Sequence, residues 1–256
     1  YYYDWLGYYW KLLEPRYWLI LWRKWTWKSL LGWYFHANLN KNENFSQVIS
    51  YWDFRYDFLN SLSNWDIKPN QYIPIWKFLL LLHLWKEILK DLSLEGDKDF
   101  IKLKKFIEEN FNLNLDQNRV LEIISTKKLK WEMFGFWWEW GKEEKWAVGS
   151  FMDYADKLKE IVVWLIERSK NNFYITIDEL DDRFRRNDEN KYILISLIKA
   201  TQSINILLYN TDWKSKIIVL LRTDIFSFLK DTDLQKIRDD NWIDIKWESK
   251  IDTNSQ

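Results

Sequence analysis

The sequence is poor in three residue types that build many functional sites. Among 256 residues there is no Cys, and there are only two His and six Gly. The absence of Cys excludes a disulfide framework, a thiolate nucleophile and a Cys-based zinc site. His36 and His83 stand far apart with no paired spacing, so we expect both to be structural rather than metal ligands.

The chain also lacks an excess of charge and a long apolar run. Its 38 basic residues balance its 38 acidic ones, so no overall attraction to nucleic acid or to an anionic membrane is expected. Apolar runs such as Phe78–Leu82 are far shorter than the roughly 20 residues of a membrane helix. No signal-peptide pattern opens the chain. The sequence therefore predicts a soluble, cytoplasmic protein with no membrane partner.

Glycine is scarce where tryptophan is abundant. An average Gly usage of about 7% predicts roughly 18 Gly in a chain of this length, whereas the sequence has 6 Gly and 20 Trp. Several Trp follow Asp or Asn, the place of Gly in tight turns; the pairs are Asp4-Trp5, Asn64-Trp65, Asp212-Trp213 and Asn241-Trp242. Our hypothesis is that many of these Trp are glycine in the functional protein, for example through a codon that the source reads as Gly. The alternative, a protein genuinely rich in Trp, stays open.

Short apolar strands alternate with amphipathic helices along the chain. This order predicts an α/β fold with a parallel sheet covered on both faces. Residues 1–38 and 151–256 are expected to form the core, with 39–150 as a mainly helical insertion. The expected strands are 17–21, 173–177, 216–221 and 243–247, and the expected helices are 28–38, 75–92, 100–110, 153–169, 192–207, 226–229 and 234–237.

The segment after the first expected strand carries the strongest motif. It matches the phosphate-binding pattern G-x-x-x-x-G-K-[ST], known as Walker A, at Lys28 and Ser29, and Trp stands at both required glycines. A phosphate loop wraps backbone N–H groups around an anion, which needs positive φ angles and no side chain in the anion's space. Indole rings there are expected to fill the volume of the nucleotide, so binding requires glycine at these Trp. The expected cofactor-binding residues are Trp22, Arg23, Lys24, Trp25, Thr26, Trp27, Lys28 and Ser29.

Two further segments lack Trp and point the same way. The apolar strand at 173–177 runs into Asp178 and Glu179, which is the form of a Walker B motif. Asp178 would hold Mg²⁺ together with Ser29, and Glu179 would polarise the attacking water. The expected strand 216–221 ends in Arg222-Thr223-Asp224. If this strand lies between the strands at 17–21 and 173–177, either Arg222 or Thr223 at its end could sense the γ-phosphate of the nucleotide. An equally good interpretation is that Thr223 or Asp224 caps a helix.

Taken in order, these three segments resemble bacterial P-loop ATPases of the AAA/STAND type. Arg238-Asp239-Asp240-Asn241, followed by a short strand ending in Trp247, is similar to the same group. The resemblance covers roughly 12–38 and 153–248, and it implies a three-layer P-loop NTPase core with an additional strand and a catalytic glutamate. It further implies ATP and Mg²⁺ as ligands, an oligomer or a conformational switch, and Glu179 and Arg222 as catalytic residues. A protein or DNA partner cannot be identified from the residues.

The sequence thus predicts an ATP-hydrolysing P-loop protein that drives a conformational switch or remodelling, on condition that Trp22, Trp25 and Trp27 are glycine. The alternative is a non-hydrolysing scaffold or interaction protein with a degenerate phosphate loop. The first interpretation requires Lys28 and Asp178 to lie on the same side of the molecule.

Overall fold

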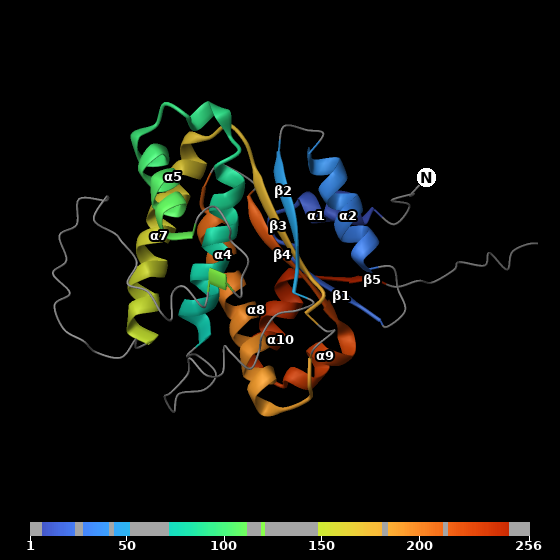
Figure 1. The fold of residues 1–256 in the computed structure, drawn as a ribbon. Helices are drawn as coiled ribbons and strands as arrows, with labels where there is room; N and C mark the ends of the chain where they lie inside the picture. The colour runs from blue at the N-terminus through green and yellow to red at the C-terminus, as the bar shows by residue number, and fades with distance from the viewer. Residues whose placement is uncertain are drawn as a thin grey trace, which may run out of the picture.

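The computed structural model describes residues 7–23, 28–40, 44–51, 72–111, 119–120, 148–180, 184–211 and 215–245, without the side chains of 28–30, 110 and 148–154. A five-stranded sheet runs through the centre of this part of the chain (Figure 1). All neighbouring strands are parallel, in the order β2-β3-β4-β1-β5, so the predicted α/β fold with a parallel sheet is confirmed. The strands are β1 (Leu19–Trp22), β2 (Phe45–Ser50), β3 (Phe173–Asp178), β4 (Lys216–Arg222) and β5 (Trp242–Ile245).

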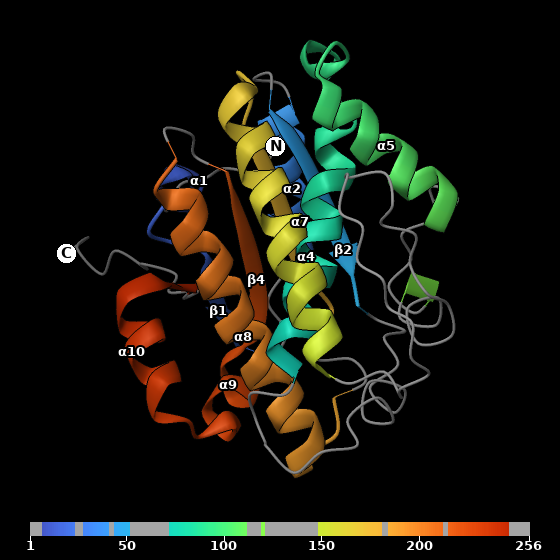
Figure 2. The same ribbon diagram turned by 90° about the vertical axis from the view of Figure 1, so that its left-hand side faces the viewer.

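Helices cover both faces of the sheet (Figures 1 and 2). One face carries α1 (Tyr8–Leu13) and α2 (Lys28–Leu39). The other face is covered by α4 and α8, while α7 packs on α4, α5 packs on α7, and α9 and α10 follow β4. The bounds of these elements are α4 (Ile73–Ile88), η3 (Leu92–Leu94), α5 (Lys98–Phe111), α7 (Val148–Arg168), α8 (Asp188–Tyr209), α9 (Thr223–Leu229) and α10 (Thr232–Asn241).

The alternation of side chains along β1 explains why its apolar run has no polar positions. Ile20 and Trp22 belong to the apolar cluster of α1 and α2, whereas Leu19 and Leu21 belong to the cluster on the other face. Successive side chains of a strand point to opposite faces, and both faces of this sheet are buried. The strand starts two residues later than predicted and extends through Trp22.

Strand β2 lies within the range 39–150, which was predicted to be a mainly helical insertion. Residues 45–50 pair in parallel with β3 and form the edge of the sheet, a strand that the sequence analysis did not predict. The sheet therefore draws a strand from the range 39–150. An edge strand pairs with a neighbour on one side only. Its sequence, Phe45-Ser-Gln-Val-Ile-Ser, is half polar and only partly buried, so neither a continuous apolar run nor a clear alternation marks it as a strand. Helices α4 and α5 lie where helices were predicted in this range.

Within the described ranges, one helix is long and apolar enough to cross a membrane by length and composition. This helix, α8, has a mean hydropathy of 1.3 over its most apolar stretch, which is 61% buried. It packs on β4 and α4, and the buried amide of Asn205 both donates to the carbonyl of Ile217 and accepts from its N–H, at 2.8 Å each. Such pairing of a buried amide with a strand backbone is typical of a core helix.

The Asn241-Trp242 pair is not a tight turn. Asn241 ends α10, and Trp242 opens β5 with a φ of −101°, which any residue adopts. The expectation of a glycine turn is therefore wrong at this pair. The other three Asp-Trp and Asn-Trp pairs lie outside the described residues.

Candidate functional site

The strand and the helix expected on either side of the motif are both present in the backbone. Strand β1 ends at Trp22, and α2 begins at Lys28, followed by Ser29. The N–H groups of a first helical turn have no partners within the helix, so this end of α2 can receive an anion. Lys24, Trp25, Thr26 and Trp27, and the side chains of Lys28 and Ser29, lie outside the described part of the structure.

The side chain of Trp22 is buried, whereas that of Arg23 is exposed. The indole of Trp22 is 2% exposed and belongs to the apolar cluster that α1 and α2 form on the sheet, whereas Arg23 is exposed. Trp22 is the last residue of β1, and the alternation of the strand turns its ring into the core. The expectation that this indole would fill the nucleotide's volume is therefore wrong for Trp22.

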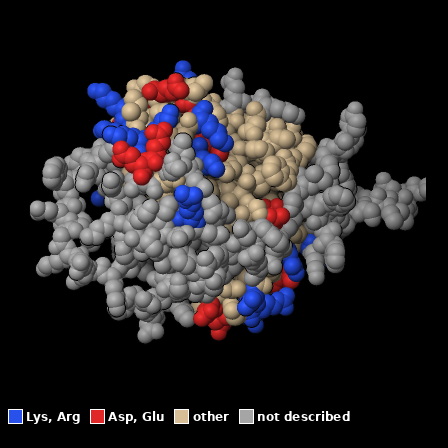
Figure 3. Space-filling view, viewed as in Figure 1, with Lys and Arg blue, Asp and Glu red and all other residues tan. Residues whose placement is uncertain are grey.

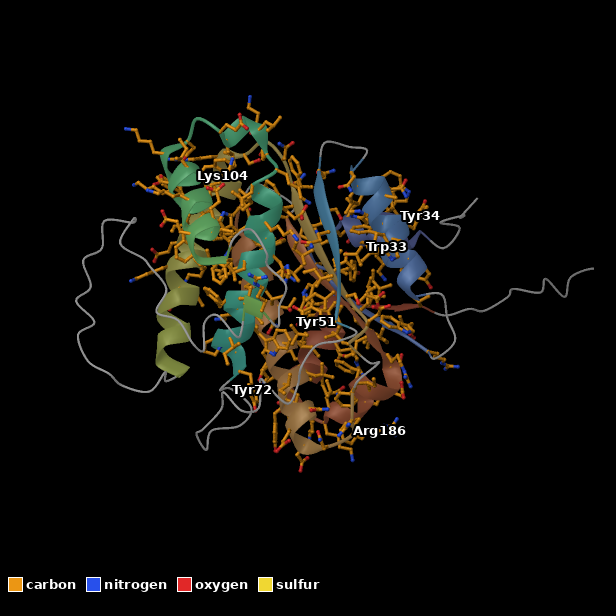
Figure 4. All side chains as sticks on the ribbon, in the orientation of Figure 1. Trp33, Tyr34, Tyr51, Tyr72, Lys104 and Arg186 are labelled. Atoms are coloured by element: carbon orange, nitrogen blue, oxygen red, sulfur yellow. The ribbon has the colours of Figure 1, made fainter. Side chains whose placement is uncertain are left out.

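Asp178 and Glu179 lie at the carboxyl end of β3, and Asp178 is buried. The carboxylate of Asp178 accepts a hydrogen bond from the N–H of Glu179 at 2.7 Å. The carbonyl of Asp178 accepts another from Tyr51, the residue after β2, at 3.0 Å; Figure 4 shows Tyr51 near the middle of the molecule. These bonds fix the end of β3 against the end of β2.

Glu179 has an unusual backbone and a partner that sequence analysis missed. Its φ is 60°, a left-handed conformation that costs a residue other than Gly about 1–2 kcal/mol. Its carboxylate accepts a hydrogen bond from the hydroxyl of Ser50, which pairs with Asp178 across β2 and β3. Only the recognition of β2 as a strand of this sheet could have drawn attention to Ser50.

At the end of β4, Arg222 is engaged by a carboxylate of its own chain. Its Nε and Nη2 donate to Asp224 at 3.0 and 2.8 Å, and Nη2 of Arg186 donates to the same carboxylate at 3.1 Å. Burial raises the pKa of Asp224, but the hydrogen bond and the charge of Arg222, helped by Arg186, hold it below its usual range. This carboxylate is therefore ionised at neutral pH.

Thr223 does not act as a helix cap. Helix α9 begins at Thr223, and no side chain caps its first turn. Among the described residues, the buried hydroxyl of Thr223 has no hydrogen-bond partner. The capping role considered from the sequence is therefore not seen for either Thr223 or Asp224, which binds Arg222 instead.

The sheet brings these residues to one edge. Trp22 and Arg222 are partners across β1 and β4, and Ile177 is the partner of Val219 across β3 and β4. Parallel strands lie about 4.8 Å apart, so β1 and β3 are separated by about 10 Å with β4 between them. The start of α2 at Lys28 and the carboxylate of Asp178 accordingly lie at the same, carboxyl edge of the sheet.

This edge has the residue types that Mg²⁺ requires. Magnesium is commonly held by one or two protein oxygens, with substrate phosphates and water completing the shell. Asp178 supplies a buried carboxylate, and Ser29 is the second residue of α2, which begins at the same edge of the sheet. No group of three or more acidic, His or Cys side chains that could hold a metal occurs in the described ranges, but magnesium bound with a nucleotide does not need such a group.

Both histidines lie away from this edge. Nδ1 of His36 lies 3.0 Å from the hydroxyl of Ser46, near the start of β2, and burial, with the charge of Lys90, lowers the pKa of His36. Burial also lowers the pKa of His83, on α4, to about 3. Both rings are therefore neutral at pH 7.

Charge on the described surface is mixed. On the face drawn in Figure 3, basic and acidic side chains lie next to one another at both ends of the molecule, as the equal numbers of the two signs predict. Comparison of the chain with protein-family models, curated proteins and solved structures finds no match. The residues that carry candidate functional chemistry lie at the carboxyl edge of the sheet.

Proposed function

We propose that this chain is the nucleotide-binding domain of a P-loop ATPase of the AAA/STAND type, which hydrolyses ATP with Mg²⁺ to drive a conformational change. The observation that carries the proposal is the sheet order, in which β4 lies between β1 and β3. This order is the one expected for a core with an additional strand, and ligands of open α/β sheets bind outside the carboxyl ends of the strands. In this order the start of α2 at Lys28, the acids at the end of β3 and Arg222 lie along one edge.

The proposed roles follow from the chemistry of each residue. Lys28 and the backbone amides before it neutralise the phosphates, while Ser29 and Asp178 hold the metal. When bound, Mg²⁺ stabilises the negative charge that develops on the phosphoryl oxygens. Glu179 orients and deprotonates the attacking water, and Arg222 contacts the terminal phosphate.

The surroundings of Glu179 support its role as the water-orienting residue. A left-handed backbone at a residue other than Gly persists only where neighbouring structure enforces it, and such residues cluster at functional sites. Here the Asp178 carboxylate binds the N–H of Glu179, and Ser50 binds its side chain. The carboxylate is thus held in one direction at the edge where a nucleotide would lie.

The condition stated from the sequence, glycine at Trp22, Trp25 and Trp27, is kept here for Trp25 and Trp27, whereas Trp22 can stay although it holds the first glycine position of the pattern. The ring of Trp22 lies in the core, in the apolar cluster with α1 and α2. A binding test can therefore keep this indole and avoid the loss of stability that its removal would cause.

The test is equilibrium binding of Mg²⁺–ATP to three folded proteins: the chain as written, W25G/W27G, and W25G/W27G with K28A. We expect binding by W25G/W27G alone, because the indoles are removed while Lys28 is kept. Circular dichroism checks that all three proteins fold. Failure of the folded W25G/W27G protein to bind would refute the proposal.

Mass spectrometry of the protein from its source tests the glycine hypothesis separately. Each Trp that is in fact Gly lowers the mass by the difference between the two residues. A mass equal to that of the written sequence would end this hypothesis.

The second candidate is a scaffold protein with a degenerate phosphate loop. Trp22 favours it, because this indole is integrated in the apolar cluster of α1 and α2 like any native core residue. In that case neither the chain as written nor W25G/W27G binds ATP, although both fold.

A further inference from the structure

The backbone of Glu179 is strained where it follows β3. Its φ is 60°, and among the described residues other than glycine only Lys230, with a φ of 38°, also has a positive value. Lys230 follows the last residue of α9, and a left-handed residue is a common end of a helix because it lets the last carbonyls find partners. Glu179 follows a strand and ends no helix. Its left-handed conformation therefore needs another reason.

A hydrogen bond to the preceding residue is one of the contacts that hold Glu179 in this conformation. The N–H of Glu179 donates to Oδ1 of Asp178 at 2.7 Å. Because the two residues are neighbours in the chain, this bond folds the side chain of Asp178 back along its own backbone. The same carboxylate is the one proposed to bind Mg²⁺ together with Ser29. One group therefore holds the strained backbone and is also the group that the metal would recruit.

We propose that the backbone of Glu179 leaves the left-handed conformation when Mg²⁺ and a nucleotide bind, an inference that rests on the proposed function. The left-handed backbone is then that of the ligand-free protein. When the carboxylate of Asp178 turns to the metal, it gives up the N–H of Glu179, and φ of Glu179 returns to the negative values that a residue with a Cβ prefers. The side chain of Glu179 turns with its backbone, so metal binding sets the position of this carboxylate.

The change is confined to the residue after the strand, and it can be measured as a difference in affinity. The carbonyl of Asp178 accepts a hydrogen bond from the N–H of Tyr51 at 3.0 Å, which holds the end of β3 in place. A left-handed backbone is costly for a residue with a Cβ and is not costly for glycine. Release of this strain on binding therefore strengthens the affinity for the ligand if residue 179 is alanine, but not if it is glycine.

The test compares the binding of Mg²⁺–ATP to E179A and to E179G, both in the W25G/W27G background. Both variants lack the carboxylate at position 179, so they differ in the cost of a left-handed backbone and not in the loss of the proposed base. We expect E179A to bind Mg²⁺–ATP about tenfold more tightly than E179G, because only alanine is released from strain. In ATP with EDTA the two affinities should be equal, since Asp178 then keeps its bond to the N–H of residue 179.

The matched control is the pair K230A and K230G in the same background, at the left-handed residue that follows α9. We expect these two variants to bind Mg²⁺–ATP equally, and circular dichroism checks that every variant folds. Equal affinities of E179A and E179G for Mg²⁺–ATP, or a difference that persists in EDTA, would overturn the inference while leaving the ATPase proposal intact. Absence of ATP binding by the folded W25G/W27G protein overturns both.

Discussion

Replacement of Trp22 by glycine tests whether this indole is a true core residue. The side chain is 2% exposed and packs among the apolar residues that α1 and α2 place on the sheet. Removing a buried aromatic ring costs about 3–5 kcal/mol, and glycine in a strand costs about 0.5–1 kcal/mol more. We therefore expect W22G to lower the free energy of unfolding by about 3.5–6 kcal/mol.

The assay is urea unfolding followed by far-ultraviolet circular dichroism, with W22F as the matched control. Phenylalanine keeps an aromatic ring in the cluster, so we expect W22F to cost about 1–2 kcal/mol with an unchanged m-value. A loss below about 1 kcal/mol for W22G would refute the packing argument. That result would mean that the apolar cluster repacks without the indole. A protein with glycine at position 22 would need such repacking.

Three further predictions address the proposed chemistry, the close approach of α2 to the sheet, and a buried cation. In the W25G/W27G background, we expect E179Q to bind ATP but to hydrolyse it at least about a hundredfold more slowly, since a general base usually contributes at least that much to the rate. The rate is measured as phosphate release, and an unchanged rate would contradict the role of Glu179. A Cβ on Gly32 of α2 would lie 3.1 Å from Cδ1 of Leu220, so we expect G32V to destabilise the protein by about 1–3 kcal/mol. We expect G32A to destabilise it by much less, because alanine is more favourable than glycine in a helix by about 1 kcal/mol. Equal denaturation midpoints for the two variants would refute this close contact. Burial lowers the pKa of Lys216 from 10.5 to about 7, so between these pH values unfolding takes up a proton and stability rises with pH. This rise should be absent in K216M, and a wild-type stability that falls from pH 7 to pH 10 would contradict the assignment.

Lys216 is a buried basic residue whose structural role was not predicted from the sequence. Its ammonium donates to the carbonyls of Leu12, Glu14 and Tyr17, at 2.8 Å to Glu14 and 3.0 Å to Tyr17. It thereby ties the connection between α1 and β1 to the start of β4. A lysine at the head of an apolar strand looks like a surface residue in the sequence, because its partners are backbone groups some 200 positions away.

The local sequence was sufficient to locate most of the core elements. The continuous apolar runs of β3 and β4, and the helical spacing in α4, α5, α7 and α8, predicted these elements to within a few residues at most ends. Strand β2 was missed because an edge strand is only half buried, and α1 was missed because six residues give too little periodicity.

The sequence by itself determined the parallel α/β fold and the candidate residues, because apolar period, charge and motif spacing are local properties of the chain. Only the tertiary structure decided which strands are neighbours, since pairing depends on contacts between distant segments. That order set Glu179 beside Ser50 and Arg222 beside the end of β1. It also gave Asp224 two arginine partners, and it buried Trp22 in the core. The direction of a side chain at the end of a strand depends on which face is covered, and no local pattern contains that information.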